Sequence, residues 1–226
     1  MPRPEYRGGG VGLGIRTLAL AAVAAALLVG CSAPGGTVEP EPSAEARGIR
    51  FAAVGDSITA ADSADFAAGD LGAASWATYA VADGFTFGGG WAEWGATTAR
   101  MADSVRPYGA DVLVLLAGTN DVAFAVPFAD TAANLDRIVD RAGIDDVLVV
   151  SIPPMDALPA GADEHNDRLA DLADDRGWRF VDASAGLRTS DGRFRDGLSS
   201  DGLHPTEAGA AVLGAAIAAE LGRPRE

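Results

Sequence analysis

Lysine is absent from this chain of 226 residues, so its 17 basic residues are all arginines and stand against 32 acidic residues. The formal net charge is −15. A surface with this balance repels the phosphate backbone of nucleic acids, so we expect no nucleic-acid partner. Because 48% of the residues are hydrophobic, the chain can nevertheless bury a sizeable core.

Cysteine is nearly absent as well. Only Cys31 is present, which excludes an intrachain disulfide. It directly follows an uncharged apolar run of 14 residues (17–30), which is shorter than the roughly 20 residues that a membrane-spanning helix needs. Three arginines precede this run, and a basic segment followed by a short apolar one is typical of a secretory signal peptide.

The segment "LLVGC" that ends at Cys31 resembles the lipobox of bacterial lipoproteins, in which the cysteine is acylated and becomes the first residue of the mature chain. This predicts a lipoprotein signal peptide over residues 1–31; the alternatives are an ordinary signal peptide or an uncleaved anchor. Residues 32–48 are small, polar and proline-containing, which predicts a flexible linker. We therefore expect an exported protein, attached by its lipid to the outer face of the cell membrane.

Short apolar runs alternate with helical patterns from residue 49 onward. The runs are rich in valine and leucine, as in parallel strands that are buried on both faces. They predict strands over 49–54, 111–117, 146–150 and 178–181, and a weaker one near 85–87. Helices are expected over 97–105, 130–142, 163–176 and 205–221. The alternation predicts one α/β domain over 49–222, with three α/β/α layers around a mostly parallel sheet.

Three of the predicted strands end in polar loops with the sequences "GDS", "GTND" and "SIPPMDA". Ligands of parallel α/β sheets bind at the carboxyl ends of the strands, so we expect these loops to converge. Ser57, in the first loop, either caps the next helix or acts as a nucleophile. The loop over 152–161 is expected to wall one side of the site.

Histidine is scarce, which shortens the search for a base that accepts the proton of a serine nucleophile. His165 lies in an acidic helical pattern without metal-ligand spacing, so we expect a solvated side chain. His204 lies in "DGLHP", where Pro205 suits the first helical position and His204 the N-cap. Asp201 is close enough to orient the imidazole, although this pattern also fits residues that only form a turn and a cap. Asp182 is a second candidate for that orienting role.

Three motifs resemble, in order, blocks I, III and V of the SGNH (GDSL-type) hydrolases: "GDSI" at 55–58, "GTND" at 118–121 and "DGLHP" at 201–205. The resemblance spans nearly the whole chain from residue 49 onward and implies the flavodoxin-like fold of that family. The G-x-S-x-G motif of other α/β-hydrolases is absent, which agrees with this assignment.

The resemblance also implies the roles of individual residues. Ser57 would be the nucleophile, His204 the general base and then acid, and Asp201 the residue that orients His204. The oxyanion hole would consist of the backbone N–H of Ser57, the backbone N–H of Gly95 and the side-chain amide of Asn120. Neither a metal nor an organic cofactor is implied.

Block II is the least regular of the motifs. Gly95 fits it best, but Trp94 stands where many members of the family have a small residue, so Gly90 is the alternative oxyanion donor. The acids beside the site, Asp56 and Asp121, are expected to tie loops together.

The implied reaction is the hydrolysis of carboxylic esters through an acyl-enzyme on Ser57. Its expected substrates are glycans that carry short acyl groups, or small lipidic esters. An acyltransferase to sugar hydroxyls would use the same residues, and a non-catalytic glycan-binding module is a third hypothesis. Trp76, Trp91 and Trp94 either line an acyl or sugar pocket or belong to the core.

Overall fold

The computed structural model describes residues 48–224. The predicted signal peptide, Cys31 and the linker up to residue 47 lie outside the described residues. Within residues 48–224 no helix combines the length and the apolar character that crossing a membrane requires.

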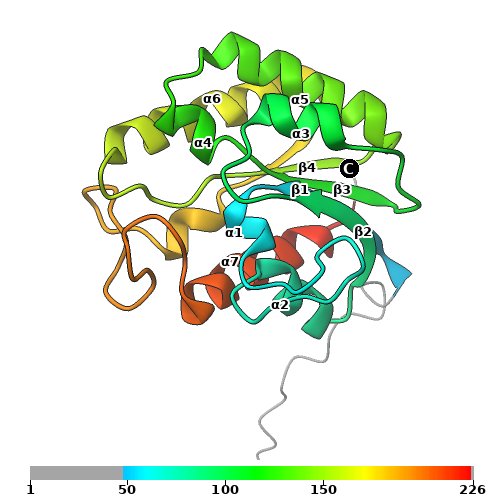
Figure 1. Cartoon of the computed structure of the whole chain (residues 1–226), viewed down its shortest axis with the longest axis horizontal. Coiled ribbons are helices and arrows are strands. Elements are labelled where there is room, and N and C mark those ends of the chain that lie inside the picture. The colour runs from blue at the N-terminus through cyan, green and yellow to red at the C-terminus, as the bar shows by residue number, and fades with distance from the viewer. Residues whose placement is uncertain (1–47, 225–226) are drawn as a thin grey trace, which may run out of the picture. The chain divides into compact units, whose positions relative to one another are not determined.

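Five parallel strands form a sheet in the order β2-β1-β3-β4-β5 (Figure 1). They are β1 (Arg50–Gly55), β2 (Thr86–Ala92), β3 (Val112–Leu116), β4 (Val147–Val150) and β5 (Arg179–Val181). The central strands β3 and β4 are buried along their whole length, which explains their unbroken runs of valine and leucine. Each predicted strand is therefore present.

The weak strand near residue 85 is longer than predicted, because β2 continues through three glycines to Ala92. Gly90 lies opposite Ala53 of β1 in the sheet. A Cβ at Gly90 would lie 2.1 Å from the carbonyl oxygen of Ala53, so the two strands approach closely only because glycine stands there. Gly90 is thus a strand residue, whereas Gly95 lies beyond the end of β2.

Helices cover both faces of the sheet (Figure 1). One face carries α2 (Trp76–Ala82) and α7 (Glu207–Leu221), and the other carries α3 (Thr98–Ser104), α5 (Phe128–Ala142) and α6 (Pro159–Arg176). Three short helices, which were not predicted, follow strands directly: α1 (Ser57–Ala60), α4 (Thr119–Ala123) and the 3₁₀ helix η2 (Ala183–Gly186). The predicted three-layer α/β/α architecture is confirmed, and α2 was also missed.

Each face of the sheet has its own hydrophobic core. The core under α2 and α7 includes Phe51, Trp76, Leu213 and Ile217. The core under α3, α5 and α6 includes Met101, Leu135, Ile138 and Leu169. Burying each such side chain contributes about 1.5–3 kcal/mol, so these two layers of contacts are a major source of the stability of the domain.

Helix α7 begins two residues later than the sequence predicts. Its N-cap is Thr206, whose Oγ1 accepts the N–H of Gly209 at 3.3 Å. Pro205 instead forms an isolated β-bridge with Ser199. His204 is therefore a residue of the preceding loop and not a helix cap, so that part of the prediction is wrong.

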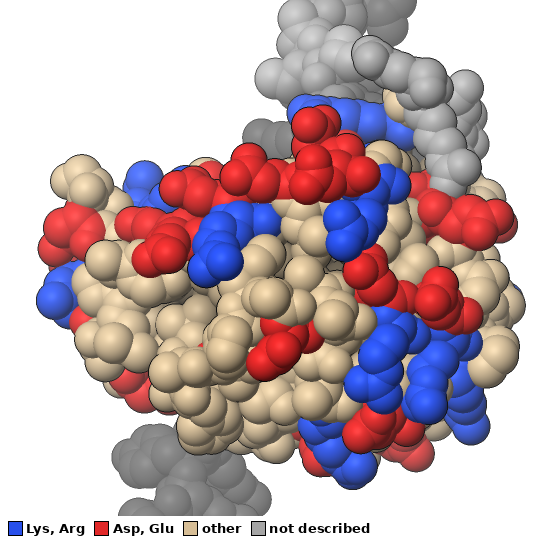
Figure 2. Space-filling view, turned by 90° about the horizontal axis from the view of Figure 1, so that it is seen from above, with Lys and Arg blue, Asp and Glu red and all other residues tan. Residues whose placement is uncertain are grey.

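The helical face formed by α3, α5 and α6 carries many acidic side chains with arginines among them (Figure 2). Arg137 pairs with Asp103 at 2.6 Å, and Arg176 pairs with Asp136 at 3.0 Å. Both pairs are solvent-exposed and contribute little to stability, typically below about 1 kcal/mol.

Candidate active site

Ser57 lies where the chain leaves β1 and turns at once into α1. Asp56 is the N-cap of that helix, and its carboxylate accepts the N–H of Ile58 at 3.0 Å. The turn leaves only 7% of Ser57 exposed, at the carboxyl end of the strand. The "GDSI" motif is thus a strand-to-helix turn that presents one hydroxyl group.

Asp201 and His204 lie in the loop before α7. The Asp201 Oδ1 atom accepts the backbone N–H of Leu203 at 2.9 Å and that of His204 at 2.8 Å. The Asp201 Oδ2 atom lies 2.7 Å from Nδ1 of the His204 imidazole. One carboxylate therefore fixes both the shape of the loop and the orientation of the ring.

Ser57, His204 and Asp201 form a continuous chain of contacts although 147 residues separate the serine from the histidine. The Ser57 Oγ atom lies 3.0 Å from Nε2 of His204, on the side of the ring opposite Asp201. A carboxylate at Nδ1 holds the ring proton there, which leaves Nε2 as the acceptor that faces the hydroxyl. This is the geometry of a serine nucleophile with an oriented base.

The carboxyl of Asp201 stays ionised over a wide pH range. Partial burial raises its pKa, but hydrogen bonds from the His204 side chain and from the backbone N–H groups of His204 and Leu203 outweigh burial and hold the pKa well below its usual range. A negative charge therefore persists beside Nδ1, where it stabilises the imidazolium that forms when Nε2 takes a proton.

Asn120 brings a side-chain amide close to the residues of block II. Its Nδ2 donates to the carbonyl of Ala96 at 3.0 Å and lies 3.4 Å from Oδ2 of Asp56. Gly95 precedes Ala96 and has a φ of 75°. Among the hydrogen bonds of residues 48–224, none uses the backbone N–H of Ser57 or of Gly95. Both N–H groups are thus available to a bound group.

A family model for the GDSL-like lipases and acylhydrolases matches residues 53–212. The chain belongs to this family. The match runs from β1 into α7 and therefore contains all three motifs and every site residue described above. This membership makes the protein a hydrolase. No curated protein matches the chain.

Solved structures share the fold of this GDSL-family chain. A GDSL-like lipase from Bacteroides thetaiotaomicron is 20% identical, with a TM-score of 0.60 over 76% of this chain and 87% of the other. A catalytic mutant of Axe2, an acetylxylan esterase from Geobacillus stearothermophilus, is 20% identical, with a TM-score of 0.59 over 79% and 98%. LAE5, an α/β hydrolase from the metagenome of Lake Arreo in Spain, is 21% identical, with a TM-score of 0.63 over 78% and 96%. All three show the same single α/β domain.

Two buried acids tie together the loops of this hydrolase. Asp121 accepts the N–H of Thr98 at 2.9 Å, the hydroxyl of Thr98 at 2.5 Å and the hydroxyl of Thr131 at 2.9 Å, which joins α4 to α3 and α5. Asp56 is completely buried, and burial raises the pKa of its carboxyl to about 6 even though the N–H of Ile58 favours the charged form.

His165 is buried and not solvated, which corrects the sequence-based expectation. Its ring lies edge-on to Phe128 and against Gly118, where a Cβ would lie 2.0 Å from the imidazole Nε2. That Nε2 finds no hydrogen-bond partner in the described part of the chain. Burial lowers the pKa of His165, which favours the neutral form of the ring beneath the "GTND" turn. The buried stripe of α6 comprises Ala162, His165, Leu169, Leu172 and Ala173.

Asp182, the alternative candidate for orienting His204, makes other contacts. Its Oδ1 accepts a hydrogen bond from Arg188 at 2.7 Å and one from Ser151 at 3.1 Å. The hydrogen bonds from Arg188 hold the pKa of this carboxyl below its usual range. Within residues 48–224, no three histidine, cysteine, aspartate or glutamate side chains lie together as a metal site.

The loop over 152–161 contacts the loop that carries Asp201 and His204. The backbone N–H of Asp156 donates to the carbonyl of Gly202 at 2.8 Å. Leu203 packs against the small apolar cluster that includes Ile152 and Met155. This loop does not line the cavity next to Ser57 described below, so it positions the site without walling that cavity.

Of the three tryptophans considered for a pocket, only Trp94 contacts a residue of the candidate site. Trp76 is fully buried in the core, and Trp91 packs against the core under α3. Trp94 is 61% exposed and stacks on the His204 ring, with 5.0 Å between centroids and 28° between planes. A cavity of about 230 Å³ lies beside this stack, lined by Ser57, Ile58, Ala61, Asp62, Ala74, Trp94, His204 and Pro205.

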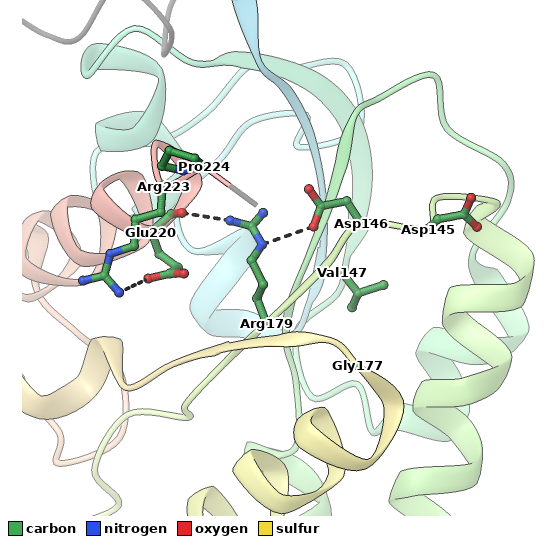
Figure 3. Close-up of a pocket in the computed structure, with 8 residues that line it drawn as sticks. All are labelled: Asp145, Asp146, Val147, Gly177, Arg179, Glu220, Arg223 and Pro224. Atoms are coloured by element: carbon green, nitrogen blue, oxygen red, sulfur yellow. Dashed lines mark hydrogen bonds and ion pairs between the residues drawn. The ribbon is translucent and has the colours of Figure 1, made fainter. Parts of the chain in front are cut away.

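A larger cavity of about 480 Å³ lies at the opposite edge of the sheet, at the amino ends of β4 and β5 (Figure 3). Four of the charged side chains that line it form two ion pairs. Arg179 contacts Asp146 at 3.1 Å and donates to the carbonyl of Glu220 at 2.9 Å, while Arg223 contacts the Glu220 carboxylate at 2.7 Å. Ser57, His204 and Asp201 do not line this cavity.

Proposed function

We propose that this hydrolase is a serine esterase that cleaves carboxylic esters through an acyl-enzyme on Ser57. One observation carries the proposal: the Ser57 hydroxyl, the His204 imidazole and the Asp201 carboxylate lie in series at 3.0 and 2.7 Å. An acylhydrolase needs a nucleophile, a base and an orienting group in that order.

In the acylation step, Ser57 Oγ attacks the ester carbonyl carbon while its proton moves to His204 Nε2. The tetrahedral intermediate then collapses, and the alcohol leaves with the proton from Nε2. Water next attacks the acyl-enzyme and gives a proton to Nε2. Release of the carboxylic acid returns that proton to Oγ. The Asp201 carboxylate stabilises the imidazolium in both halves of the reaction.

The negative charge that develops on the carbonyl oxygen needs donors that are already in place. We assign this role to the backbone N–H groups of Ser57 and Gly95 and to the Asn120 amide. Three neutral donors stabilise an oxyanion strongly, and losing one of them typically costs about 100- to 1000-fold in turnover. The Asn120 amide has two N–H donors; one is held by the Ala96 carbonyl at 3.0 Å, and the other, with Asp56 Oδ2 at 3.4 Å, is the one assigned to this contact.

The proposed substrates are short acyl esters, carried either by glycans or by small lipidic alcohols. Axe2, which shares the fold, is described as an acetylxylan esterase, which supports the glycan esters. The cavity of about 230 Å³ beside Ser57 is small, which supports a short acyl group.

The test is the hydrolysis of p-nitrophenyl acetate, butyrate, octanoate and palmitate by the full chain in mild detergent, beside Ser57→Ala. We expect turnover by the wild type and none above background by the variant. A folded wild type that cleaves none of these esters would overturn the proposal. Acylation of an added polyol at the expense of free acid would identify a transferase instead.

We further propose that the protein is exported and anchored by lipid on Cys31. The support is the charged segment, the apolar run and the cysteine at its end. Cells that express the chain and are fed an alkyne-tagged fatty acid should label it, and Cys31→Ser should abolish both the label and the membrane association. Equal labelling of the variant would refute the anchor.

A further inference from the structure

Trp94 stacks on His204 but has no role in the catalytic steps proposed above. Its indole Nε1 donates to the carbonyl of Ala61 at 3.0 Å, so the ring is fixed at both ends: by this hydrogen bond and by its stack on His204. Ala61 has a φ of 45°, which is rare for a residue with a Cβ. An exposed aromatic ring that is held this firmly forms a rigid wall.

The cavity that Trp94 walls is almost entirely apolar. Apart from Ser57 and His204, its lining consists of apolar side chains and the single carboxylate of Asp62. Asp62 lies exposed at the rim, where its Oδ1 accepts the N–H of Ala74 at 2.9 Å. A sugar ring in this cavity would leave its hydroxyls without partners, which is unfavourable, whereas a hydrocarbon chain needs none.

The volume of the cavity limits the length of such a chain. About 230 Å³ corresponds to roughly eight water molecules at about 30 Å³ each. This is below the range of about 300–1,000 Å³ for pockets that enclose larger ligands. A few carbon atoms would fill this volume, and a long fatty acyl chain would exceed it.

We propose that this cavity is the acyl-chain subsite of the esterase and that Trp94 sets the longest straight acyl chain it accepts. The inference rests on the proposed function and deepens it. The acyl carbon bonded to Ser57 Oγ would place its chain against Ile58, Ala61 and Ala74, with the indole as one wall. The alcohol of the ester, including a sugar, would lie outside this cavity.

The experiment compares kcat/KM for p-nitrophenyl acetate, butyrate, hexanoate and octanoate in the full chain, Trp94→Ala, Trp94→Phe and Phe124→Ala. Phe124 is the matched control, because it is 67% exposed and does not line the cavity. The ratio of octanoate to butyrate cancels any uniform loss that results from unstacking the imidazole. We expect Trp94→Ala to raise this ratio by about ten-fold or more, and Phe124→Ala to leave it unchanged. Trp94→Phe keeps a ring in place and should stay near the wild type.

A second series varies the alcohol at constant acetyl: ethyl, butyl and octyl acetate, followed by acid release. We expect Trp94→Ala to leave this profile unchanged. An active wild type whose acyl profile is the same in Trp94→Ala would overturn this inference while leaving the proposed function intact. A Trp94→Ala shift in the alcohol series alone would likewise overturn it, since the cavity would then hold the alcohol. A wild type inactive on every ester would overturn the proposed function and this inference with it.

Discussion

The two edges of the sheet carry cavities of opposite character. The cavity at the amino ends of β4 and β5 has about twice the volume of the other, and its Arg179, Asp146, Glu220 and Arg223 side chains pair with one another. The smaller cavity at the carboxyl ends is apolar and borders a serine hydroxyl in contact with an imidazole. Size and charge therefore do not locate the site. The site is located by the Ser57 hydroxyl and by the His204 imidazole that Asp201 orients toward it.

We expect the largest loss of activity from His204→Ala, at the carboxyl edge of the sheet. Without a base, kcat should fall by about 10⁴-fold or more. Because Thr206 caps α7, the fold should survive, and the thermal midpoint should stay within a few degrees of the wild type. Steady-state hydrolysis of p-nitrophenyl butyrate and a thermal melt check both points. Wild-type turnover by this variant would remove His204 from the mechanism.

Asn120→Ala should have the next largest effect. It removes one oxyanion donor, so we expect kcat to fall by about 100- to 1000-fold with little change in KM. The matched control is Asn134→Ala, since Asn134 lies on α5 and donates to the hydroxyl of Thr98 at 3.2 Å, away from Ser57. A change in KM alone, or an equal loss in both variants, would contradict the assigned role.

Asp56→Asn tests the buried carboxyl beside Ser57 by its effect on the free energy of unfolding, and not by its effect on the rate of hydrolysis. Burial raises the pKa of Asp56 to about 6 from an ordinary value of 3.8. Between about pH 4 and 6 the unfolded chain releases this proton while the folded chain keeps it, so the free energy of unfolding falls as the pH rises. The full difference is about 3 kcal/mol above pH 6, and it vanishes below pH 4.

The variant should therefore gain stability over the wild type as the pH rises from 4 to 7, as measured by urea denaturation. The low pKa of Asp201 acts below pH 4 and does not overlap with this range. Asp83→Asn, which makes the same change at an exposed position, is the control. A constant difference between Asp56→Asn and the wild type would contradict the predicted titration.

The smallest effect on activity is expected at the opposite edge. Arg179→Met removes the pair with Asp146 and the hydrogen bond to the Glu220 carbonyl, at a cost of about 2 kcal/mol in the free energy of unfolding. We expect kcat/KM to stay within about two-fold of the wild type, because Ser57, Asp201 and His204 do not line this cavity. A large loss of kcat/KM in a folded variant would mean that the two edges are coupled.

The features predicted correctly from the sequence were those that a short stretch of residues indicates by itself, such as an apolar run or a polar loop at the end of a strand. The valine and leucine runs of β3 and β4 indicated buried parallel strands, which the structure confirms. The convergence of the "GDS" and "GTND" loops followed from the rule that such loops share one edge of a sheet, and the Asp56–Asn120 contact joins them. The place of His204 beside Ser57 was implied by the family resemblance.

The features that were missed depend on how separate elements approach each other. His165 looked solvated because acids flank it in the chain, yet its spacing of three and four from Ala162 and Leu169 places it on the buried stripe of α6. The length of β2 depends on the carbonyl of Ala53, and the position of Trp94 depends on that of Ala61. No local pattern records such contacts.

The most direct test of the account is to trap the acyl-enzyme. The full chain is mixed with p-nitrophenyl butyrate, quenched in acid within the first turnover and digested with trypsin. Cleavage after Arg50 and Arg100 places Ser57 in one peptide, residues 51–100, which is then fragmented in a mass spectrometer. The account predicts one butyryl group on Ser57, absent from Ser57→Ala. A butyryl group on another residue, or turnover that persists in Ser57→Ala, would contradict it.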